Sequence, residues 1–171
     1  MGRKKETFAE FSTLSNEAES PGLPMKERVL IVDGHSMIFQ WPDLAALHTR
    51  NPALARETLI RTLDGLRDAT DQHVLLVFDG QGNRPNEASE PHHIQVFYSK
   101  SGQTADSIIE RLVAKYAETY DVTVATDDRL EQTTVATFGG STISSTQLQQ
   151  EVAAAQSALG DRLKRLHRPR S

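Results

Sequence analysis

Residues 28–36, RVLIVDGHS, form the stretch that decides the fold of this chain. Four consecutive apolar residues, Val29 to Val32, are followed at once by Asp33 and Gly34. A continuous apolar run rich in β-branched residues is typical of a strand buried on both faces, as in a parallel sheet covered by helices. In open α/β sheets ligands bind beyond the carboxyl ends of the strands, which is where we expect Asp33. A simple turn is the alternative interpretation, because Asp-Gly pairs are common in turns.

The same pattern occurs twice more along the chain. The run at 73–79, HVLLVFD, again ends in an acid, Asp79, and the run at 121–126 is followed by Asp127 and Asp128. Shorter strands are expected at 94–98 and 141–143. Helices are expected at 51–69, 104–120 and 129–138, and from 144 to about 159, where Gly160 is the expected stop. This alternation predicts an α/β fold with a mostly parallel central sheet and helices on both faces.

Apolar stripes and caps support these helices. Asn51 followed by Pro52 is a good helix start, Thr104 is a natural N-cap, and Ser144 with Gln147 resembles a capping box. Trp41, in the apolar segment 37–42, is expected in the core rather than on a base-stacking surface. The expected buried stripes are Leu54, Leu59, Leu63 and Leu66 in one helix, and Ile108, Ile109, Leu112, Val113 and Tyr116 in another.

Composition places limits on the class of protein. The chain has 171 residues, of which 37% are hydrophobic and 25% are charged, as expected for a globular domain with polar flanks. The absence of cysteine excludes disulfides, thiolate metal sites and a cysteine nucleophile, and fits a reducing, cytoplasmic location. The net charge of -4 argues against a protein that coats polyanions without specificity. No apolar stretch is long enough to span a membrane, so no membrane partner is expected.

The sequence also predicts how the chain is divided into a folded domain and flanking segments. Residues 1–26 are polar and are expected to be a flexible extension. Residues 27–160 are expected to form the folded domain, and residues 161–171 a basic tail. That tail is either simply solvated or faces RNA or the ribosome. Its basic residues are Arg162, Lys164, Arg165, Arg168 and Arg170.

Acidic residues converge on one edge of the predicted sheet. Asp33, Asp79 and the Asp127-Asp128 pair follow three strands, and Asp106 begins a helix that should start at the same edge. Carboxylates gathered in one cleft repel each other unless they are protonated or bridged by a cation. Oxygen ligands without cysteine favour Mg²⁺ or Mn²⁺ over Zn²⁺, and such ions typically serve phosphodiester hydrolysis. His92 and His93 are adjacent on an extended segment and would point to opposite faces, which disfavours a shared ion.

Four segments occur in an order that matches a known family. VDGHSMIFQWP, LLVFDG, TADSIIERL and VATDDRLEQ together closely resemble the YacP-like branch of the NYN domains, relatives of the PIN-domain nucleases. The similarity covers about 28 to 152. It implies a PIN-like three-layer sandwich and metal-dependent endoribonuclease activity, with links in some members to cleavage of messenger RNA on translating ribosomes.

The resemblance also implies site residues. Asp33, Asp106 and Asp128 match the family's acidic centre, and Asp127 adds a further carboxylate beside them. Asp79 and Glu110 are candidates for orienting the attacking water or completing the metal shell. The candidates for RNA contacts, besides Ser36, are the basic residues Arg56, Arg84, Lys100 and Arg129. Mg²⁺ or Mn²⁺ is the expected cofactor and RNA the expected partner; the oligomeric state is left open.

Two positions depart from the family pattern. Ser36 stands where the family commonly has Asn, and its hydroxyl has a shorter reach. Asp127 stands where the family commonly has Ser, and its charge either strengthens metal binding or repels RNA.

Other classes of function are also considered. A non-catalytic RNA- or ribosome-binding domain is the main alternative to the endoribonuclease. A haloacid-dehalogenase phosphatase would need a second Asp two residues after the first, where this chain has His35. A receiver domain would need its acid pair at the first strand. P-loop and nucleophile-elbow motifs are absent from the sequence.

Overall fold

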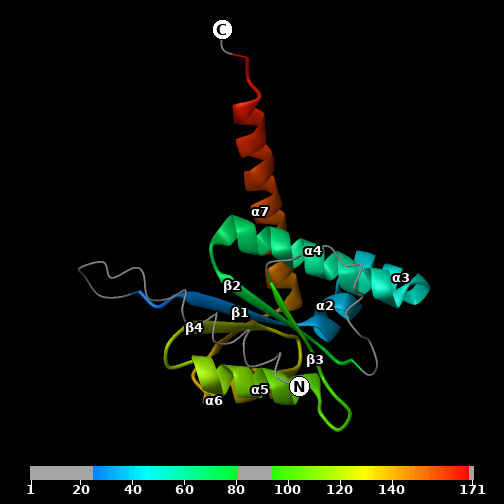
Figure 1. The fold of residues 1–171 in the computed structure, drawn as a ribbon, viewed down its shortest axis with the longest axis vertical. Coiled ribbons are helices and arrows are strands. Elements are labelled where there is room, and N and C mark those ends of the chain that lie inside the picture. The colour runs from blue at the N-terminus through cyan, green and yellow to red at the C-terminus, as the bar shows by residue number, and fades with distance from the viewer. Residues whose placement is uncertain (1–24, 81–93, 170–171) are drawn as a thin grey trace, which may run out of the picture.

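The computed structural model describes residues 25–80 and 94–169. Within these residues the chain forms a sheet of five parallel strands in the order β3-β2-β1-β4-β5. The strands are β1 (Arg28–Asp33), β2 (His73–Phe78), β3 (Gln95–Tyr98), β4 (Asp121–Ala125) and β5 (Ser141–Ile143). Because all strands run the same way, their carboxyl ends lie at one edge of the sheet, on the right in Figure 1. The expected parallel sheet is confirmed.

The strand order places a topological switch point between β1 and β4. The chain builds the sheet outward from β1 through β2 to β3 and then crosses back to add β4 and β5 on the other side. In register, Val32 lies between Leu76 and Ala125, so Asp33 and Thr126 leave the sheet at about the same level. In open α/β sheets, ligand sites form at such a point.

Helices cover both faces of the sheet, as expected (Figure 1). One face carries α2 (Gly34–Gln40), α3 (Pro42–Arg50), α4 (Pro52–Thr70) and the first part of α7 (Ser145–Leu166). The other face carries α5 (Ala105–Tyr116) and α6 (Arg129–Thr137). The expected caps are present, because Asn51 accepts from Leu54 N, Thr104 accepts from Ser107 N, and Ser144 and Gln147 form a capping box. Among the described helices, none is both long and apolar enough to cross a membrane.

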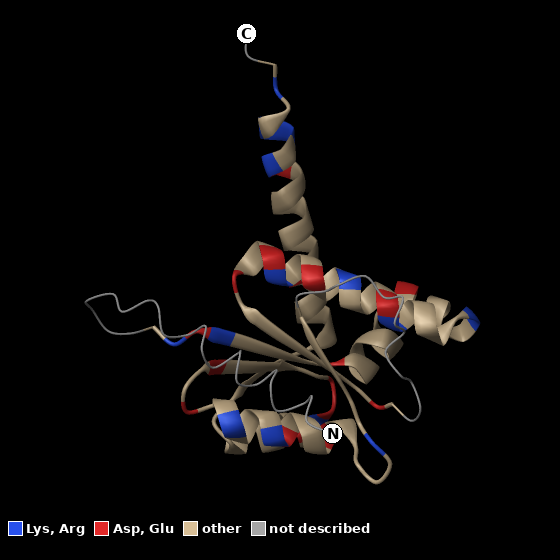
Figure 2. Cartoon of the chain, viewed as in Figure 1, with Lys and Arg blue, Asp and Glu red and all other residues tan. Residues whose placement is uncertain are grey.

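Helix α7 runs further than the sequence predicted. The expected end near Leu159 is wrong, because the helix continues through Gly160 to Leu166. A helical glycine costs only about 1 kcal/mol relative to alanine, and strong helix formers on both sides offset that cost. The last turns project away from the sheet, and their basic residues are visible as blue segments in Figure 2. The division of the chain into a domain and a basic tail stays a prediction.

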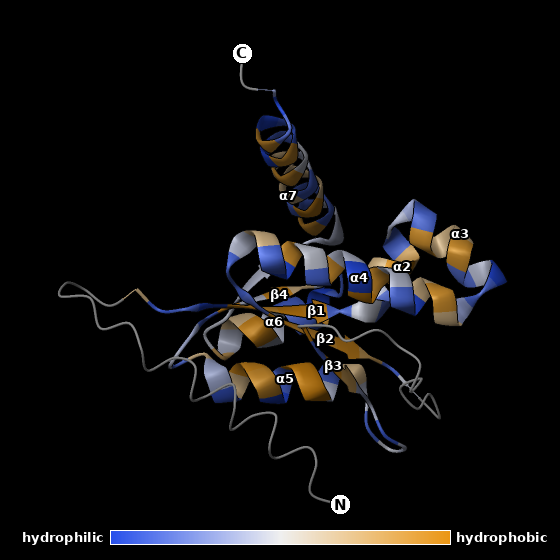
Figure 3. Ribbon diagram, turned by 45° about the horizontal axis from the view of Figure 1, so that its top comes forward, coloured by the Kyte–Doolittle hydropathy of each residue, from blue (hydrophilic) through white to orange (hydrophobic). Residues whose placement is uncertain are grey.

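Two apolar clusters sandwich the sheet. Alternate side chains of β1 and β2 point to opposite faces: Leu30 and Leu76 pack under α4, and Ile31 and Leu75 pack under α5. Apart from polar residues at their ends, these two strands consist of apolar residues, which are orange in Figure 3. Trp41 joins the first cluster and donates from Nε1 to the carbonyl oxygen of Ser145 at 2.9 Å, so its expected core position is confirmed.

The structure corrects three further details. Residues 37–42, for which no helix was expected, form the end of α2, the residue after it and the start of α3. The sequence did not predict α2, because a seven-residue helix is too short to show a 3.6-residue period. Leu54 is exposed, and the buried stripe of α4 consists of Ala55, Leu59, Ile60, Leu63 and Leu66. Helix α5 ends at Tyr116 rather than Tyr120.

Candidate functional site

Asp33 lies at the end of β1, and its carboxylate is buried and fully hydrogen-bonded. It accepts from the backbone nitrogens of His35 (3.1 Å) and Ser36 (3.5 Å) and therefore caps α2. Its other oxygen accepts from the hydroxyls of Ser36 (2.9 Å) and Thr126 (3.2 Å). Burial raises the pKa of Asp33, the bonds from Ser36 and Thr126 oppose that rise, and the nearby Asp106 carboxylate adds to it.

The Asp33-Gly34 pair is a helix start rather than a simple turn. Gly34 is the first residue of α2, and a Cβ atom at this position would lie 2.5 Å from the ring of Phe78. The glycine is therefore required by the close packing of α2 over the end of β2.

Asp106 lies in the first turn of α5 and is exposed. Its position is fixed by Asp79, whose carboxylate accepts from Ala105 N at 2.8 Å and from the Ser99 hydroxyl at 3.2 Å. Asp79 thus ties the start of α5 to the ends of β2 and β3. This bonding favours a positioning role for Asp79 over direct participation.

Glu131 lies in the first turn of α6 and is only 2% exposed. Neither of its carboxylate oxygens has a partner at full hydrogen-bond geometry, although the Asp106 and Thr126 side chains lie close enough to affect its pKa. Burial, followed by a side-chain contact with Asp106 and by the charges of Asp33 and Asp106, raises the pKa of Glu131 to about 10, and the Thr126 side chain opposes that rise. A buried acid beside two other carboxylates is costly for a fold, which makes Glu131 the residue that packing explains least.

These three acids form one cluster at the switch point. One carboxylate oxygen from each of Asp33, Asp106 and Glu131 lies within 4.8 Å of the other two. Two oxygens on opposite sides of one Mg²⁺ ion are roughly 4 Å apart, so this spacing is close to that of a shared ion. A cation would also offset the repulsion among these carboxylates, which contributes to the raised pKa of Glu131. The donor set therefore fits a hard divalent cation such as Mg²⁺ or Mn²⁺.

The Asp127-Asp128 pair makes different contacts. Asp127 accepts from Ser145 N at 2.8 Å and from the Ser145 hydroxyl at 2.5 Å, so its carboxylate anchors the start of α7. Asp128 caps α6 by accepting from Leu130 N at 2.9 Å and Glu131 N at 3.4 Å. Among the described residues, the cluster of acids spaced for one metal does not include either of them. Their proposed role as metal ligands stays a prediction.

Ser36 connects the two strand ends that flank the switch point. Its hydroxyl donates to Asp33, lies 3.5 Å from the Thr126 hydroxyl and accepts from Asp127 N at 3.3 Å. The serine at this position thus orders the site through short bonds.

The remaining candidates among the described residues are not members of the acidic cluster. Glu110 is half-buried in the second turn of α5. Arg56 on α4 lies near Tyr98, where its charge partly offsets the rise that burial causes in the tyrosine's pKa. Lys100 and Arg129 are exposed, at the turn after β3 and at the start of α6. Arg84, His92 and His93 lie outside the described residues.

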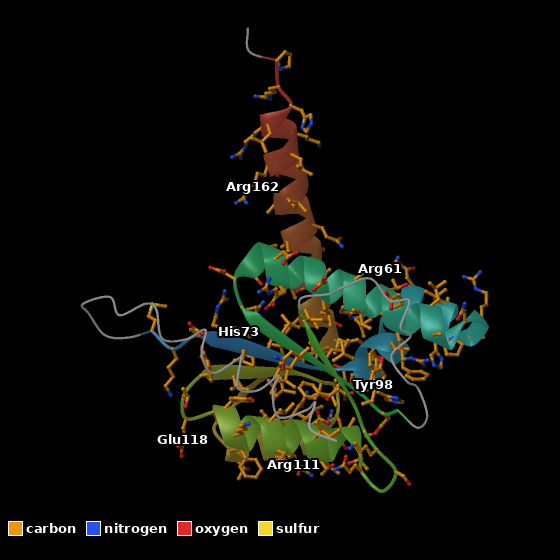
Figure 4. The ribbon with its side chains drawn as sticks, in the orientation of Figure 1. Arg61, His73, Tyr98, Arg111, Glu118 and Arg162 are labelled. Atoms are coloured by element: carbon orange, nitrogen blue, oxygen red, sulfur yellow. The ribbon has the colours of Figure 1, made fainter. Side chains whose placement is uncertain are left out.

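Acidic segments lie at both ends of the sheet in Figure 2, and those at the carboxyl edge include the segments that follow β1 and β4. Figure 4 shows Tyr98 near this edge, whereas His73 and Glu118 lie toward the opposite edge and Arg162 lies on the projecting part of α7. The candidate site is therefore confined to the carboxyl edge.

Glu131 is the site residue that the sequence reasoning missed. The signal was present, because Glu131 follows Asp128 by three residues at the start of an expected helix. An acid in a first helical turn is usually explained by the helix dipole. Only the burial of Glu131 distinguishes it from such an acid.

Comparisons with known proteins agree with this geometry. The model of the YacP-like NYN domain matches residues 30–171. The chain is 29% identical over 140 residues to the uncharacterized protein YacP of Bacillus subtilis (strain 168), and the match covers 81% of this chain and 82% of that protein.

Solved structures give the same result. A crystal structure of Rae1 (YacP) from Bacillus subtilis matches with a TM-score of 0.72 and 30% identity, covering 81% of this chain and 80% of that one. A second structure, of a single-residue variant of Rae1 (YacP), matches with a TM-score of 0.72 and 28% identity, covering 84% and 85%. The PIN-like α/β fold implied by the sequence is thereby confirmed.

Proposed function

Because the chain belongs to the YacP-like NYN domain family, which supports a nuclease-like function on RNA, we propose that it is a metal-dependent endoribonuclease. The observation that carries the proposal is the buried Glu131 carboxylate, whose oxygen lies within 4.8 Å of carboxylate oxygens of Asp33 and Asp106. We propose these three residues as the ligands of Mg²⁺ or Mn²⁺. Of these ligands, Asp33 and Asp106 were expected from the sequence, and Glu131 is added from the structure.

Each ligand has a defined task in this proposal. Asp33 is held rigidly by Ser36 and Thr126 and gives the site a fixed point. Asp106 is exposed and faces the substrate side, and Glu131 closes the site from within. A divalent cation, when bound, supplies Lewis-acid chemistry that neutralises charge on the scissile phosphate and makes a water molecule a stronger nucleophile.

Neighbouring residues complete the proposed site. Asp79 positions Asp106 through Ala105, and Glu110 lies one turn further along α5, where it is a candidate for orienting water. Arg56, Lys100 and Arg129 are proposed to contact the RNA backbone, as Arg84 was predicted to do. Positive side chains around an acidic centre hold a polyanion that the acids alone would repel.

The experiment combines metal titration with cleavage. We would titrate Mg²⁺ and Mn²⁺ calorimetrically into wild type, Asp106→Asn and the control Glu118→Gln, whose acid lies toward the opposite edge of the sheet (Figure 4). The same proteins would be incubated with single-stranded RNA and the products resolved on a gel. We expect wild type and the control to bind metal and cleave, and Asp106→Asn to do neither. RNA binding without metal-dependent cleavage by wild type would instead assign a non-catalytic RNA-binding domain.

The resemblance extends the proposal to messenger RNA on translating ribosomes in the cytoplasm. The basic end of α7, with Arg162, Lys164 and Arg165, supports this extension because it is exposed and projects from the domain. We would compare cleavage of one message as naked RNA and during translation in a cell-free extract. Faster cleavage that requires translation would support a role for the ribosome, and equal rates would contradict it.

A further inference from the structure

The second half of α7 projects from the domain. Up to Ala155 this helix packs on α4 and on the first core cluster, to which Leu148 and Val152 belong. Residues 156–166 continue the same helix away from the sheet, as Figure 3 shows from a second direction, and we call them the arm. At 1.5 Å per residue, the arm is roughly 16 Å long.

Three leucines of the arm are exposed on one face. The exposed fractions of Leu159, Leu163 and Leu166 are 52%, 48% and 74%. Their spacing of four and then three residues keeps them on one side of a helix, and the same spacing toward the start of α7 reaches Ala155 and Val152, which touch the core. The apolar face that holds α7 on the domain thus continues into solvent, and we call its exposed part the leucine stripe.

The leucine stripe fits a docking surface. Single exposed leucines are normal on protein surfaces, but three in line on a projecting helix form one continuous apolar face. Helices in proteins owe most of their stability to the packing of such a face. A partner that covers the stripe would therefore stabilise the arm.

The polar side chains of the arm are mainly basic, as the blue segments in Figure 2 show. Residues 159–170 contain five basic residues and one acid, Asp161. A partner should complement this charge as well as the apolar stripe. The chemistry of the arm thus calls for a segment that combines apolar side chains with negative charge.

The amino-terminal part of the same chain has this composition. Residues 6–19, ETFAEFSTLSNEAE, lie outside the described residues, and their sequence contains four glutamates and neither lysine nor arginine. Phe8, Phe11 and Leu14 recur at every third position among the glutamates. We call residues 6–19 the acidic segment, whose charge of -4 opposes the charge of +4 on residues 159–170.

The chain enters the sheet next to the helix on which α7 packs. The Arg28 guanidinium donates to the carbonyl oxygen of Thr70 at 2.8 Å, which places the start of β1 beside the end of α4. Helix α4 in turn packs against α7. Leu14 precedes Met25, the first described residue, by 11 residues, and an extended chain of that length spans up to roughly 36–40 Å. This reach is about twice the length of the arm, so the acidic segment can lie along it.

A segment of the same chain needs less contact area than a second molecule does. Stable interfaces between two proteins bury about 1,200–2,000 Å² in total, and three leucines on a short helix supply only part of that area. A tethered segment, by contrast, is held at an effective concentration of roughly millimolar, at which weak contacts suffice. The size of the leucine stripe therefore favours the chain's own acidic segment over a second copy.

We propose that the acidic segment docks on the arm of its own chain, with Phe8 and Phe11 on the leucine stripe and the glutamates facing the basic residues. The segment becomes ordered when it docks, as polar segments with a few apolar residues commonly do. In this state it covers the end of α7 for which a ribosome contact is proposed. Neither metal nor RNA takes part in the docking, so the inference does not depend on the proposed function.

The test uses a spin label on the acidic segment of the full-length chain. The protein has no cysteine, so Ser12→Cys provides a single attachment site between Phe11 and Leu14. Backbone amide signals of ¹⁵N-labelled protein would be recorded with the spin label active and after its reduction. We expect the amides of residues 159–166 to lose most of their intensity while the label is active, and those of α5, on the other face of the sheet, to keep theirs.

Substitutions in the arm should release the segment. Leu163→Gln, or Arg162→Glu together with Arg165→Glu, should restore most of the lost amide intensity, because each change removes one part of the complementarity. All three side chains are exposed, so the fold should be unchanged. Leu54→Gln is the matched control, because Leu54 is 42% exposed, close to the 48% of Leu163, and lies in the first turn of α4 next to α3.

An exchange of charges and a mixing experiment complete the test. Adding Glu10→Arg and Glu17→Arg to the doubly substituted arm should bring the intensity loss back, because opposite charges face each other again. Mixing spin-labelled protein without ¹⁵N and ¹⁵N-labelled protein without the spin label would detect contacts between molecules. Intensity loss in such a mixture equal to that within one molecule would assign the stripe to a second copy and overturn the inference. Full intensity of the arm in the spin-labelled protein, or equal release by Leu54→Gln, would overturn it as well.

Discussion

Asp128 and Glu131 lie three residues apart at the start of α6, and their carboxylates have opposite surroundings. Asp128 is exposed and accepts hydrogen bonds from Leu130 N and Glu131 N. Glu131 is buried beside the Asp33 and Asp106 carboxylates, and neither of its oxygens has a partner at full hydrogen-bond geometry. The folding of α6 accounts for Asp128, because a capping acid stabilises a helix. It does not account for Glu131, whose burial beside two other carboxylates destabilises the metal-free protein.

The largest effect that separates the two acids is expected in cleavage. Glu131→Gln should lower metal-dependent RNA cleavage by at least about 100-fold, because even residues behind metal ligands commonly contribute 10–100-fold. Asp128→Asn should stay close to wild type, because asparagine caps a helix as well as aspartate does. Single-turnover cleavage of a labelled RNA at saturating Mg²⁺ would measure both rates.

The same pair of variants would reveal an error in this assignment. If Asp128→Asn is as inactive as Glu131→Gln, then Asp128 belongs to the catalytic centre, as the resemblance implied. Circular dichroism of both variants would show whether α6 still forms, which separates lost chemistry from lost structure.

A second difference is expected in the pH dependence of stability. The pKa of Glu131 is about 10 in the folded protein against 4.5 for an unperturbed glutamate. As pH rises through this window, the unfolded chain has lost the proton that the folded chain still holds, so unfolding becomes more favourable. The contribution of Glu131 to the stability of the metal-free fold is therefore fully present below about pH 4.5, is lost progressively as pH rises through the window, and changes no further above about pH 10. Glu131→Gln should remove this dependence and stabilise the metal-free protein at pH 7 by on the order of 1–3 kcal/mol.

Denaturant unfolding between pH 5 and pH 9, with EDTA and then with Mg²⁺, measures this effect. Mg²⁺ should stabilise wild type more than Glu131→Gln, since only wild type keeps all three proposed ligands. If the unfolding free energies of the two proteins change equally with pH in EDTA, Glu131 is already ionised in the folded protein.

A third, smaller effect concerns Asp127, whose carboxylate is bound to Ser145 rather than to the cluster. In a double-mutant cycle, Asp127→Asn and Ser145→Ala should show a coupling of about 1–2 kcal/mol in unfolding free energy, as expected for a hydrogen bond to a charged group. Cleavage by Asp127→Asn should be nearly unchanged. A strong loss of cleavage without loss of stability would instead support Asp127 as a metal ligand.

The sequence predicts the sheet because its strands carry the signal locally. The apolar runs ending in Asp33, Asp79 and Asp127 identify buried parallel strands, and the caps Asn51, Thr104 and Ser144 identify helix starts. Each of these signals lies within a few residues of the feature that it predicts. Helix α2 was not predicted, because seven residues show no helical period. The end of α7 was placed too early, because Gly160 indicated a helix end and the helix-forming residues on both sides of it outweigh that signal.

The candidate site is less predictable because it depends on contacts between distant residues. Asp33 and Asp106 could be expected at one edge from strand and helix order alone. The tasks of Asp79 and Asp127 depend on Ala105 and Ser145, which no local pattern links to them. Glu131 is distinguished from an ordinary first-turn acid only by its burial in the folded protein.

The smallest expected effect tests the other half of the comparison, the capping role of Asp128. Asp128→Ala should lower the unfolding free energy by about 1 kcal/mol, because the backbone nitrogens of Leu130 and Glu131 lose their acceptor, while Asp128→Asn should change it by only a few tenths. Thr104→Ala, which removes the corresponding cap of α5, should show a loss of similar size and serves as the matched control. Guanidinium chloride unfolding at pH 7 would resolve these differences. If Asp128→Asn loses as much as Asp128→Ala, the charge of Asp128 acting on the helix dipole would be the stabilising feature, and the hydrogen bonds would be secondary.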